Sequence, residues 1–140
     1  MRIDAGLAIR DLGIRDFVLY GNPVSETEFL RMFKKIIGKD QNKHAIVSHD
    51  PNDFEVTWQQ IEAKIAELQA AEPMRLLRMQ RNRLIQQTDW RATVDYPNPD
   101  KQAWLDYRQA LRDLPETADP QLDENGQLTN VIWPLSPEEQ

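Results

Sequence analysis

The chain of 140 residues contains no cysteine. Disulfide bonds, thiol catalysis and thiolate zinc sites are therefore excluded, and a cytosolic origin fits. Its five glycines are scattered, so no glycine-rich loop is present to cradle a phosphate. No apolar run approaches the roughly 20 residues that a membrane-spanning helix needs. The amino-terminal residues MRIDAGLAIRDLG mix charges with apolar side chains, a pattern unlike that of a secretory signal.

Positive charge is also in short supply. The net charge is −6, from 17 Lys and Arg against 23 Asp and Glu. The excess lies at the carboxyl end, where residues 116–140 hold six acids and no Lys or Arg. Nucleic-acid binding requires clustered positive charge, so this balance argues against a nucleic-acid-binding protein.

The amino-terminal half predicts a small β-α-β unit. Residues 16–20 are rich in β-formers and precede the turn signal Gly-Asn-Pro. Ser25 and Glu28 then have the spacing of a capping box, and apolar residues at helical spacing continue to Ile37, with Gly38 as the predicted helix end. Residues 45–47 predict a second strand that pairs with residues 17–20.

A long helix is predicted next. Thr57 and Gln60 form a second capping box, and Trp58, Ile61, Ile65 and Leu68 follow as its apolar stripe. Pro73 lacks a backbone donor, so it is expected to break or kink the helix. We place the boundary between two parts of the chain there, giving an α/β unit with its long helix over 1–72 and a second module over 73–140.

The second module predicts an antiparallel helical hairpin followed by an extended acidic tail. The first helix carries Leu77, Leu84 and Ile85 on one face. In the second, Asn98 is the expected cap and Pro99 the first helical residue. Pro115 is expected to end that helix after Leu114, and further prolines keep the tail extended. The fold class expected is therefore α+β and mostly α.

Catalytic and metal-binding arrangements are weak in this sequence. Ser25 and Ser48 lack the G-x-S-x-G setting of an activated nucleophile. His44, His49, Asp50 and Asp53 lie close together, yet their spacing matches no zinc or calcium template. We therefore expect no enzyme, no metal and no cofactor, and we expect these loop residues to set a turn.

The only basic cluster has three open interpretations. Its arginines can form a solvated helix face paired with nearby acids, a partner-binding surface through bidentate contacts, or a nucleic-acid contact, which the surrounding acids disfavour. The cluster comprises Arg75, Arg78, Arg81, Arg83 and Arg91.

The aromatic residues have two interpretations. Trp90, Trp104 and Tyr107 either fill a core between the helices or hold a partner, because aromatic side chains dominate the energetics of both cores and interfaces. Trp133 lies in an apolar patch with Val131 and Ile132, and it fits core packing and a linear binding motif equally well. The predicted partner-binding residues are Arg78, Arg81, Trp90, Trp104, Tyr107, Val131, Ile132 and Trp133.

Three motifs in order carry a family resemblance. They are R-x-R-L-I-x-x-T-D-W at residues 81–90, W-x-x-Y-R-Q-A-L-R-D at residues 104–113 and W-P at residues 133–134. This pattern resembles the carboxyl-terminal module of phage tail assembly, or tail-fibre assembly, chaperones. The first half, through its GNP, EFLRMFKKI and SHDPNDFEVTW segments, resembles small tail-associated proteins of marine phages.

The resemblance implies a non-catalytic phage tail protein that acts by protein–protein contact, as a tail or tail-fibre assembly chaperone. The alternative is a permanent structural component of the virion tail, fibre or baseplate, and a smaller third possibility is a factor acting on a host protein. The implied partner is a phage tail or tail-fibre protein, with no nucleic acid and no membrane. The implied location is the host cytoplasm during assembly, or the virion tail in the alternative case, and the oligomeric state stays open.

Overall fold

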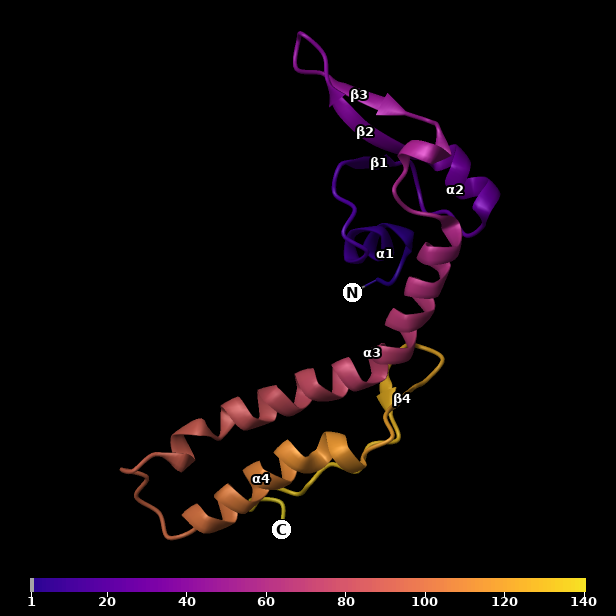
Figure 1. Ribbon diagram of the computed structural model, residues 1–140. Helices are drawn as coiled ribbons and strands as arrows, with labels where there is room; N and C mark the ends of the chain where they lie inside the picture. The colour runs from indigo at the N-terminus through magenta and orange to yellow at the C-terminus, as the bar shows by residue number, and fades with distance from the viewer. Residues whose placement is uncertain (1) are drawn as a thin grey trace. The chain divides into compact units, whose positions relative to one another are not determined.

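The computed structural model describes residues 2–140 (Figure 1). About 49% of the chain is helical, and residues 2–140 hold four α-helices and two small antiparallel sheets. The mixed, helix-rich character that the sequence predicts is thus confirmed. Contacts divide the chain into two compact units, one up to Ala70 and one from Ala71.

The first unit begins with α1 (Ala5–Asp11), a stretch for which the sequence gives little indication. Asp4 caps it, because its Oδ1 accepts a hydrogen bond from the N–H of Leu7 at 2.9 Å. One face of this short helix is fully buried, through Ala5, Ala8 and Ile9.

The sheet of the first unit is antiparallel. Its strands are β1 (Phe17–Leu19), β2 (Phe33–Lys39) and β3 (Ala45–Ser48), in the order β1-β2-β3. The predicted strands at residues 16–20 and 45–47 are present, but they do not pair with each other. β2 lies between them, so the predicted β-α-β unit is wrong.

Helix α2 (Glu26–Met32) is shorter than the sequence predicts. The predicted cap at Ser25 is confirmed, since the N–H of Glu28 donates to Ser25 Oγ at 3.2 Å. Glu28 also reaches back as predicted, but its Oε2 accepts from the N–H of Val24, at 2.8 Å, and not from that of Ser25. The helix then ends at Met32, and Gly38, the expected helix end, lies inside β2.

The conversion of residues 33–37 from predicted helix to strand has a packing cause. In β2, Phe33 and Lys35 point to the same side and are both buried, whereas a helix would turn them apart. Lys35 Nζ donates to the carbonyl oxygen of Asp16 at 3.0 Å. Pairing with strands on both sides satisfies the β2 backbone, which outweighs the helical spacing of its apolar residues.

An aromatic core holds the first unit together. Phe33 is fully buried, with ring centroids 5.0 Å from Phe29, 4.7 Å from Phe54 and 5.5 Å from Phe17. Burial of several aromatic rings supplies the large apolar area that a unit of this size needs.

Helix α3 (Trp58–Gln87) begins where the sequence predicts. Gln60 N–H donates to Thr57 Oγ1 at 3.3 Å and Gln60 Oε1 accepts from Thr57 N–H at 2.9 Å, which confirms the second capping box. The helix continues through Pro73, so the predicted break there is wrong. Proline removes only one backbone hydrogen bond. The 14 helical residues that follow it keep their own hydrogen bonds, so the helix continues.

The second unit contains the 3₁₀ helix η2 (Asp89–Ala92), then α4 (Lys101–Thr117), which runs alongside the carboxyl-terminal half of α3 (Figure 1). Helix α4 follows Asp100 as its capping residue, so the predicted cap at Asn98 and helix start at Pro99 are wrong. Pro115 lies inside α4, whose last bond joins the N–H of Ala118 to the carbonyl of Leu114.

The chain after α4 forms a short two-stranded sheet, β4 (Gln121–Leu122) with β5 (Leu128–Thr129). A turn at residues 124–126 joins these strands, and Gly126 adopts a φ of 75° that favours glycine. Residues 131–136 then run without helix or strand beside α4.

Candidate partner-binding site

Helix α4 presents an aromatic face to the rest of the second unit. Trp104, Tyr107 and Leu111 lie three or four residues apart, so helical periodicity gathers them on one side. All three are buried, together with Tyr96 from the preceding loop. Partly buried residues from α3 and from the tail pack on this cluster: Leu84, Ile85 and Trp133.

Arg108 joins α4 to the end of α3. Its buried Nη1 donates at 2.9 Å to three acceptors: the Ile85 carbonyl, Thr88 Oγ1 and Asp89 Oδ1. The Ile85 carbonyl lies in the last turn of α3 and also accepts from the N–H and the hydroxyl of Thr88, at 3.0 and 2.8 Å. Arg108 thus adds a contact from α4 to the turn that ends α3.

Arg91 occupies the centre of an aromatic socket. Its guanidinium carbon lies 3.8 Å from the ring centroid of Trp104 and 4.5 Å from that of Trp90, distances at which a cation is attracted to a ring face. Nη1 donates to the Tyr96 hydroxyl at 3.0 Å, and Nη2 donates to Glu138 Oε1 at 2.8 Å. One arginine thus links η2, the loop, α4 and the chain end.

Asp100 also belongs to the hydrogen-bond network around Arg91, through Tyr96 and Trp104. Its Oδ1 accepts from the Tyr96 hydroxyl at 2.7 Å and its Oδ2 from the indole N–H of Trp104 at 3.0 Å. The Tyr96 hydrogen bond, with a smaller contribution from Trp104, holds the pKa of Asp100 below its ordinary value of 3.8.

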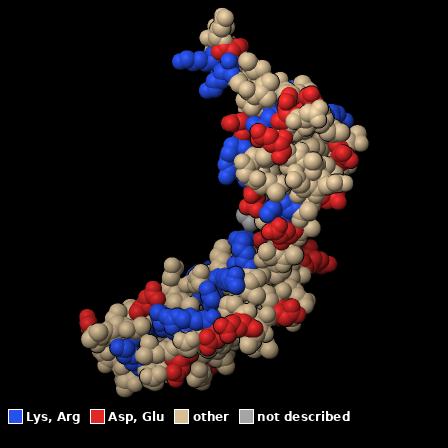
Figure 2. All heavy atoms as spheres, viewed as in Figure 1, with Lys and Arg blue, Asp and Glu red and all other residues tan. Residues whose placement is uncertain are grey.

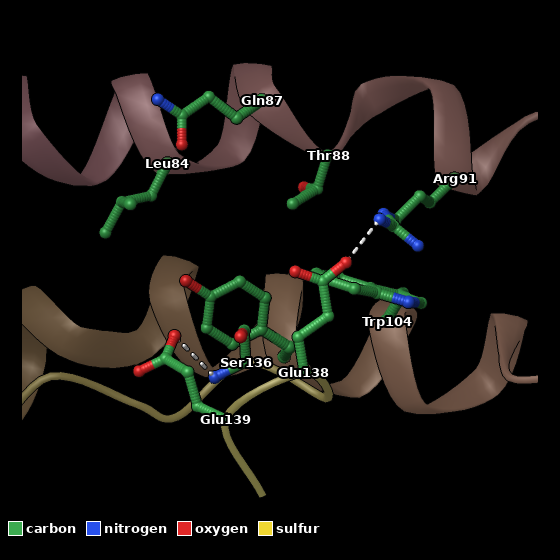
Figure 3. Close-up of a pocket in the computed structure, with 9 residues that line it drawn as sticks. Leu84, Gln87, Thr88, Arg91, Trp104, Ser136, Glu138 and Glu139 are labelled. Carbon is green, nitrogen blue, oxygen red and sulfur yellow. Dashed lines mark hydrogen bonds and ion pairs between the residues drawn. The ribbon is translucent and has the colours of Figure 1, made fainter.

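A cavity of about 260 Å³ opens beside the socket (Figure 3). Leu84 and Thr88 line it from α3, Trp104 from α4, and Glu138 and Glu139 from the chain end. Figure 3 shows the Glu138 carboxylate reaching across this space to Arg91. The cavity wall also includes the Tyr107 phenol, whose pKa is raised by burial and, to a smaller extent, by Glu139.

The structure divides the predicted aromatic residues into two groups. Trp104 and Tyr107 belong to the buried cluster, so they form the interior of the module in this conformation. Trp90 is 51% exposed, although its ring meets Tyr96 edge-on at 5.2 Å. Trp133 is half-buried against the cluster.

The predicted tail residues also differ from one another. Ile132 is 92% exposed, whereas Val131 is half-buried like Trp133. An almost fully exposed isoleucine between two packed neighbours leaves an apolar side chain free for contact with another chain.

The basic cluster is distributed over the surface of α3 and η2. Figure 2 shows a row of positively charged atoms over the carboxyl-terminal half of α3. Arg78 is exposed, and Arg81 is half-buried beside Asn82, whose Oδ1 accepts from it at 2.9 Å. Arg75 pairs with Glu72 through two hydrogen bonds, and this pairing lowers the pKa of Glu72.

Several residues of this network carry no sequence signal that marks their role. Tyr96, Asp100 and Trp104 are spaced four apart, a regularity that is visible only once α4 is known to begin after Asp100. Arg108 resembles any surface arginine of an amphipathic helix, and Glu138 resembles any acid of the tail. Their partners lie 19 to 47 residues away in the chain, beyond the reach of local patterns.

The loop around the two histidines has a structural role. Asp50 Oδ1 accepts from the N–H of Asn52 at 3.0 Å, and Ser48 Oγ donates to Asp53 Oδ2 at 2.6 Å. Residues 50–53 thus set the turn before α3, as the sequence predicts. Within residues 2–140, no group of three potential metal ligands converges, and no helix is long and apolar enough to cross a membrane.

These observations define the second unit as a small helical module, in which two buried or stacked arginines tie a helix pair to a folded-back chain end. Residues 74–138 match the family described as phage tail assembly chaperone protein. This match of the carboxyl-terminal module confirms the resemblance seen in its motifs. No curated protein and no solved structure matches the chain.

Proposed function

We propose that the chain is a non-catalytic assembly chaperone that holds a phage tail or tail-fibre protein in the host cytoplasm until the tail is built. The observation that carries this proposal is the family match over residues 74–138, since it covers the helix pair, the arginine network and the chain end together. The likeness of residues 1–72 to small tail-associated proteins, and their assignment as a separate domain, stay predictions.

The partner contact uses the exposed members of the predicted set. Trp90 and Ile132 offer apolar side chains, and Arg78 offers a guanidinium for a carboxylate or carbonyl of the partner. Arg81 and Val131 are half-buried and offer less side-chain surface. Trp104, Tyr107 and Trp133 support it from within, because their rings hold the helix pair and the chain end in place.

A chaperone of this kind covers an adhesive surface of its client. Exposed aromatic and aliphatic residues at the centre of an interface supply most of its binding energy, while arginines at its rim fix orientation. The acidic chain end keeps the free chaperone from self-association through like-charge repulsion.

The test is co-expression of the tagged chain with the tail and tail-fibre proteins of the same phage. We expect one of them to co-purify, and the double variant Trp90→Ala, Ile132→Ala to lose at least about tenfold in affinity. The matched control is Met79→Ala, which removes an exposed apolar side chain elsewhere on α3. Equal capture by the wild type and the double variant would remove these two residues from the contact.

The composition of purified phage particles distinguishes a chaperone from a structural component. A chaperone is absent from them, whereas a permanent tail part is present in a fixed copy number measurable by mass spectrometry. Detection in fixed copy number would replace the proposal by the virion-component alternative. Capture of a host protein in the absence of phage proteins would instead point to a host-directed factor.

A further inference from the structure

The carboxyl-terminal strap, defined as residues 131–140, is held mainly by side chains. Residues 131–136 are neither helix nor strand. Within residues 2–140, no backbone N–H of residues 131–135 donates a hydrogen bond. The anchors are the half-buried Trp133, the buried Ser136 and the ion pair of Glu138 with Arg91. A segment with so few buried bonds opens at low free-energy cost.

The strap also fails to fill the surface on which it lies. Three cavities flank it, of about 260, 360 and 270 Å³. Glu138 borders the first, Leu135 the second and Ile132 the third. These hollows are open at the surface, so the strap leaves part of the surface beside it uncovered; we call the surface beneath and beside the strap, with its three hollows, the groove.

The Arg91 socket is built independently of the strap. Trp104, Trp90 and Tyr96 fix the guanidinium by stacking and by the hydrogen bond from Nη1. The strap contributes only Glu138, whose side chain is 70% exposed. An ion pair with one largely exposed partner contributes little to stability. The socket therefore persists when Glu138 leaves, and its free Nη2 is then directed at the groove.

We propose that this groove is the docking site for an extended, acidic segment of the tail protein, which displaces the strap. The segment carries an aromatic residue and a carboxylate spaced as Trp133 and Glu138 are in the strap. In the free protein the strap thus occupies the groove, with an aromatic ring and a carboxylate like those of the client segment that displaces it. This inference rests on the proposed function and names the part of the client that is bound.

The charges around the groove select this chemistry. Arg91 supplies one oriented cation for a carboxylate, while Asp100 lies close to it and disfavours a doubly charged phosphate. The aromatic cluster beside the socket accepts a ring, as it accepts Trp133. Displacement of the strap also brings the Tyr107 and Trp104 side of the cavity into contact with the client.

The probe for this site is a fluorescein-labelled peptide with the sequence of residues 130–140. It is titrated against the full chain and against the full-length double variant Trp133→Ala, Glu138→Gln, whose own strap competes poorly. Because a bound strap lowers the fraction of open groove, we expect the variant to bind the peptide at least about tenfold more tightly than the wild type does. Equal affinity, or no binding to either protein, would overturn the inference.

A charge swap checks the socket even if single variants perturb folding. Arg91→Glu in the strap-weakened chain is expected to bind the native peptide at least about tenfold more weakly, and binding is expected to recover with a peptide carrying Glu138→Lys. Recovered binding requires a folded groove. It would therefore show that the Arg91→Glu variant lost one contact and did not unfold. Arg112→Glu, on the exposed surface of α4, is the matched control and should leave both affinities unchanged. Failure of the swapped pair to recover overturns the role of Arg91.

Competition links the peptide to the client. Excess unlabelled peptide is expected to release the captured tail protein from the wild-type chain. If the chain captures a tail protein but never binds the peptide, the docking inference fails and the proposed function stands. If the peptide binds and no tail protein is captured, the proposed function fails. If native mass spectrometry shows a dimer that the peptide dissociates, the groove belongs to the strap of a second copy, and the inference is overturned.

Discussion

Arg108 Nη1 donates a hydrogen bond of 2.9 Å to the hydroxyl oxygen of Thr88, and both residues are buried. This bond joins the middle of α4 to the residue that follows α3. The same nitrogen also donates to the Ile85 carbonyl, alongside the N–H and hydroxyl of Thr88, so a single α4 side chain contacts the end of α3 at two points.

Replacement of Arg108 by leucine is predicted to destabilise the second unit by about 1–3 kcal/mol, because the buried Thr88 hydroxyl oxygen loses its donor, whereas the Ile85 carbonyl keeps the N–H and hydroxyl of Thr88. Asp89 is largely exposed and adds little to this cost. Denaturant unfolding followed by circular dichroism measures the change. Arg112→Leu, on the exposed side of α4, should change stability by less than about 0.5 kcal/mol. Similar effects for both variants would contradict the buried role of Arg108.

The hydrogen bonds to Asp100 predict an acid-sensitive loop. Because the folded-state pKa lies below 3.8, the stabilisation by Asp100 is complete above that value and is lost as the pH falls through the lower, folded-state pKa. Asp100→Asn should therefore be less stable than the wild type at neutral pH, and the difference should shrink below about pH 4. Unfolding midpoints between about pH 7 and pH 2.5 report this convergence. A difference that is constant over that range would contradict the prediction, and Asp95→Asn controls for the loss of one exposed carboxylate.

The strand assignment of residues 33–39 is tested by two substitutions four residues apart. Phe33→Ala should cost about 3–5 kcal/mol, because the ring is fully buried among three other aromatic rings. Ile37→Ala should cost less than about 0.5 kcal/mol, because that side chain is 56% exposed. In a helix packed on the core through Phe33, Ile37 would be buried on the same face, whereas β2 has left the core by residue 37. Comparable losses in thermal unfolding of the two variants would favour the helix.

Pro73 is predicted to be a site where alanine stabilises α3. The ring removes the hydrogen bond that the Gln69 carbonyl would otherwise accept, and proline is about 3 kcal/mol worse than alanine within a helix. The more flexible unfolded chain offsets part of this gain, so we expect Pro73→Ala to add about 1–2 kcal/mol. Pro99→Ala, before α4, is the control and should change stability little. A loss of stability in Pro73→Ala would show that the surrounding chain is adapted to the ring.

Local signals in the sequence are reliable where the physics is local. The capping boxes at Ser25 and Thr57 each need only a side chain and an amide three residues on, and both are present. The turn at Gly126 depends on one residue's freedom to adopt a positive φ. The family motifs at residues 81–134 are likewise a property of the sequence alone, and the family match confirms them.

Predictions fail where distant residues decide. Phe33 and Ile36 fit a helix by spacing, yet pairing of β2 with strands on both sides overrides that preference. Asn98 is a good capping residue by type, but Tyr96 and Trp104 converge on Asp100, which sets the start of α4 instead. Pro115 lies inside α4 because its missing bond costs less than the packing of the adjacent, buried Leu114.

The sequence by itself determined the starts of α2 and α3, the acidic chain end and the motifs that the second module shares with its matching family, since each depends on residues close together or on a fixed order of motifs. Only the tertiary structure decided which arginines matter. Arg91 and Arg108 differ from Arg78 and Arg112 in their surroundings, and those surroundings come from rings, carbonyls and carboxylates brought together by folding. A charge surrounded by rings or buried against carbonyls binds far more specifically than the same charge in water, and no local pattern records that difference.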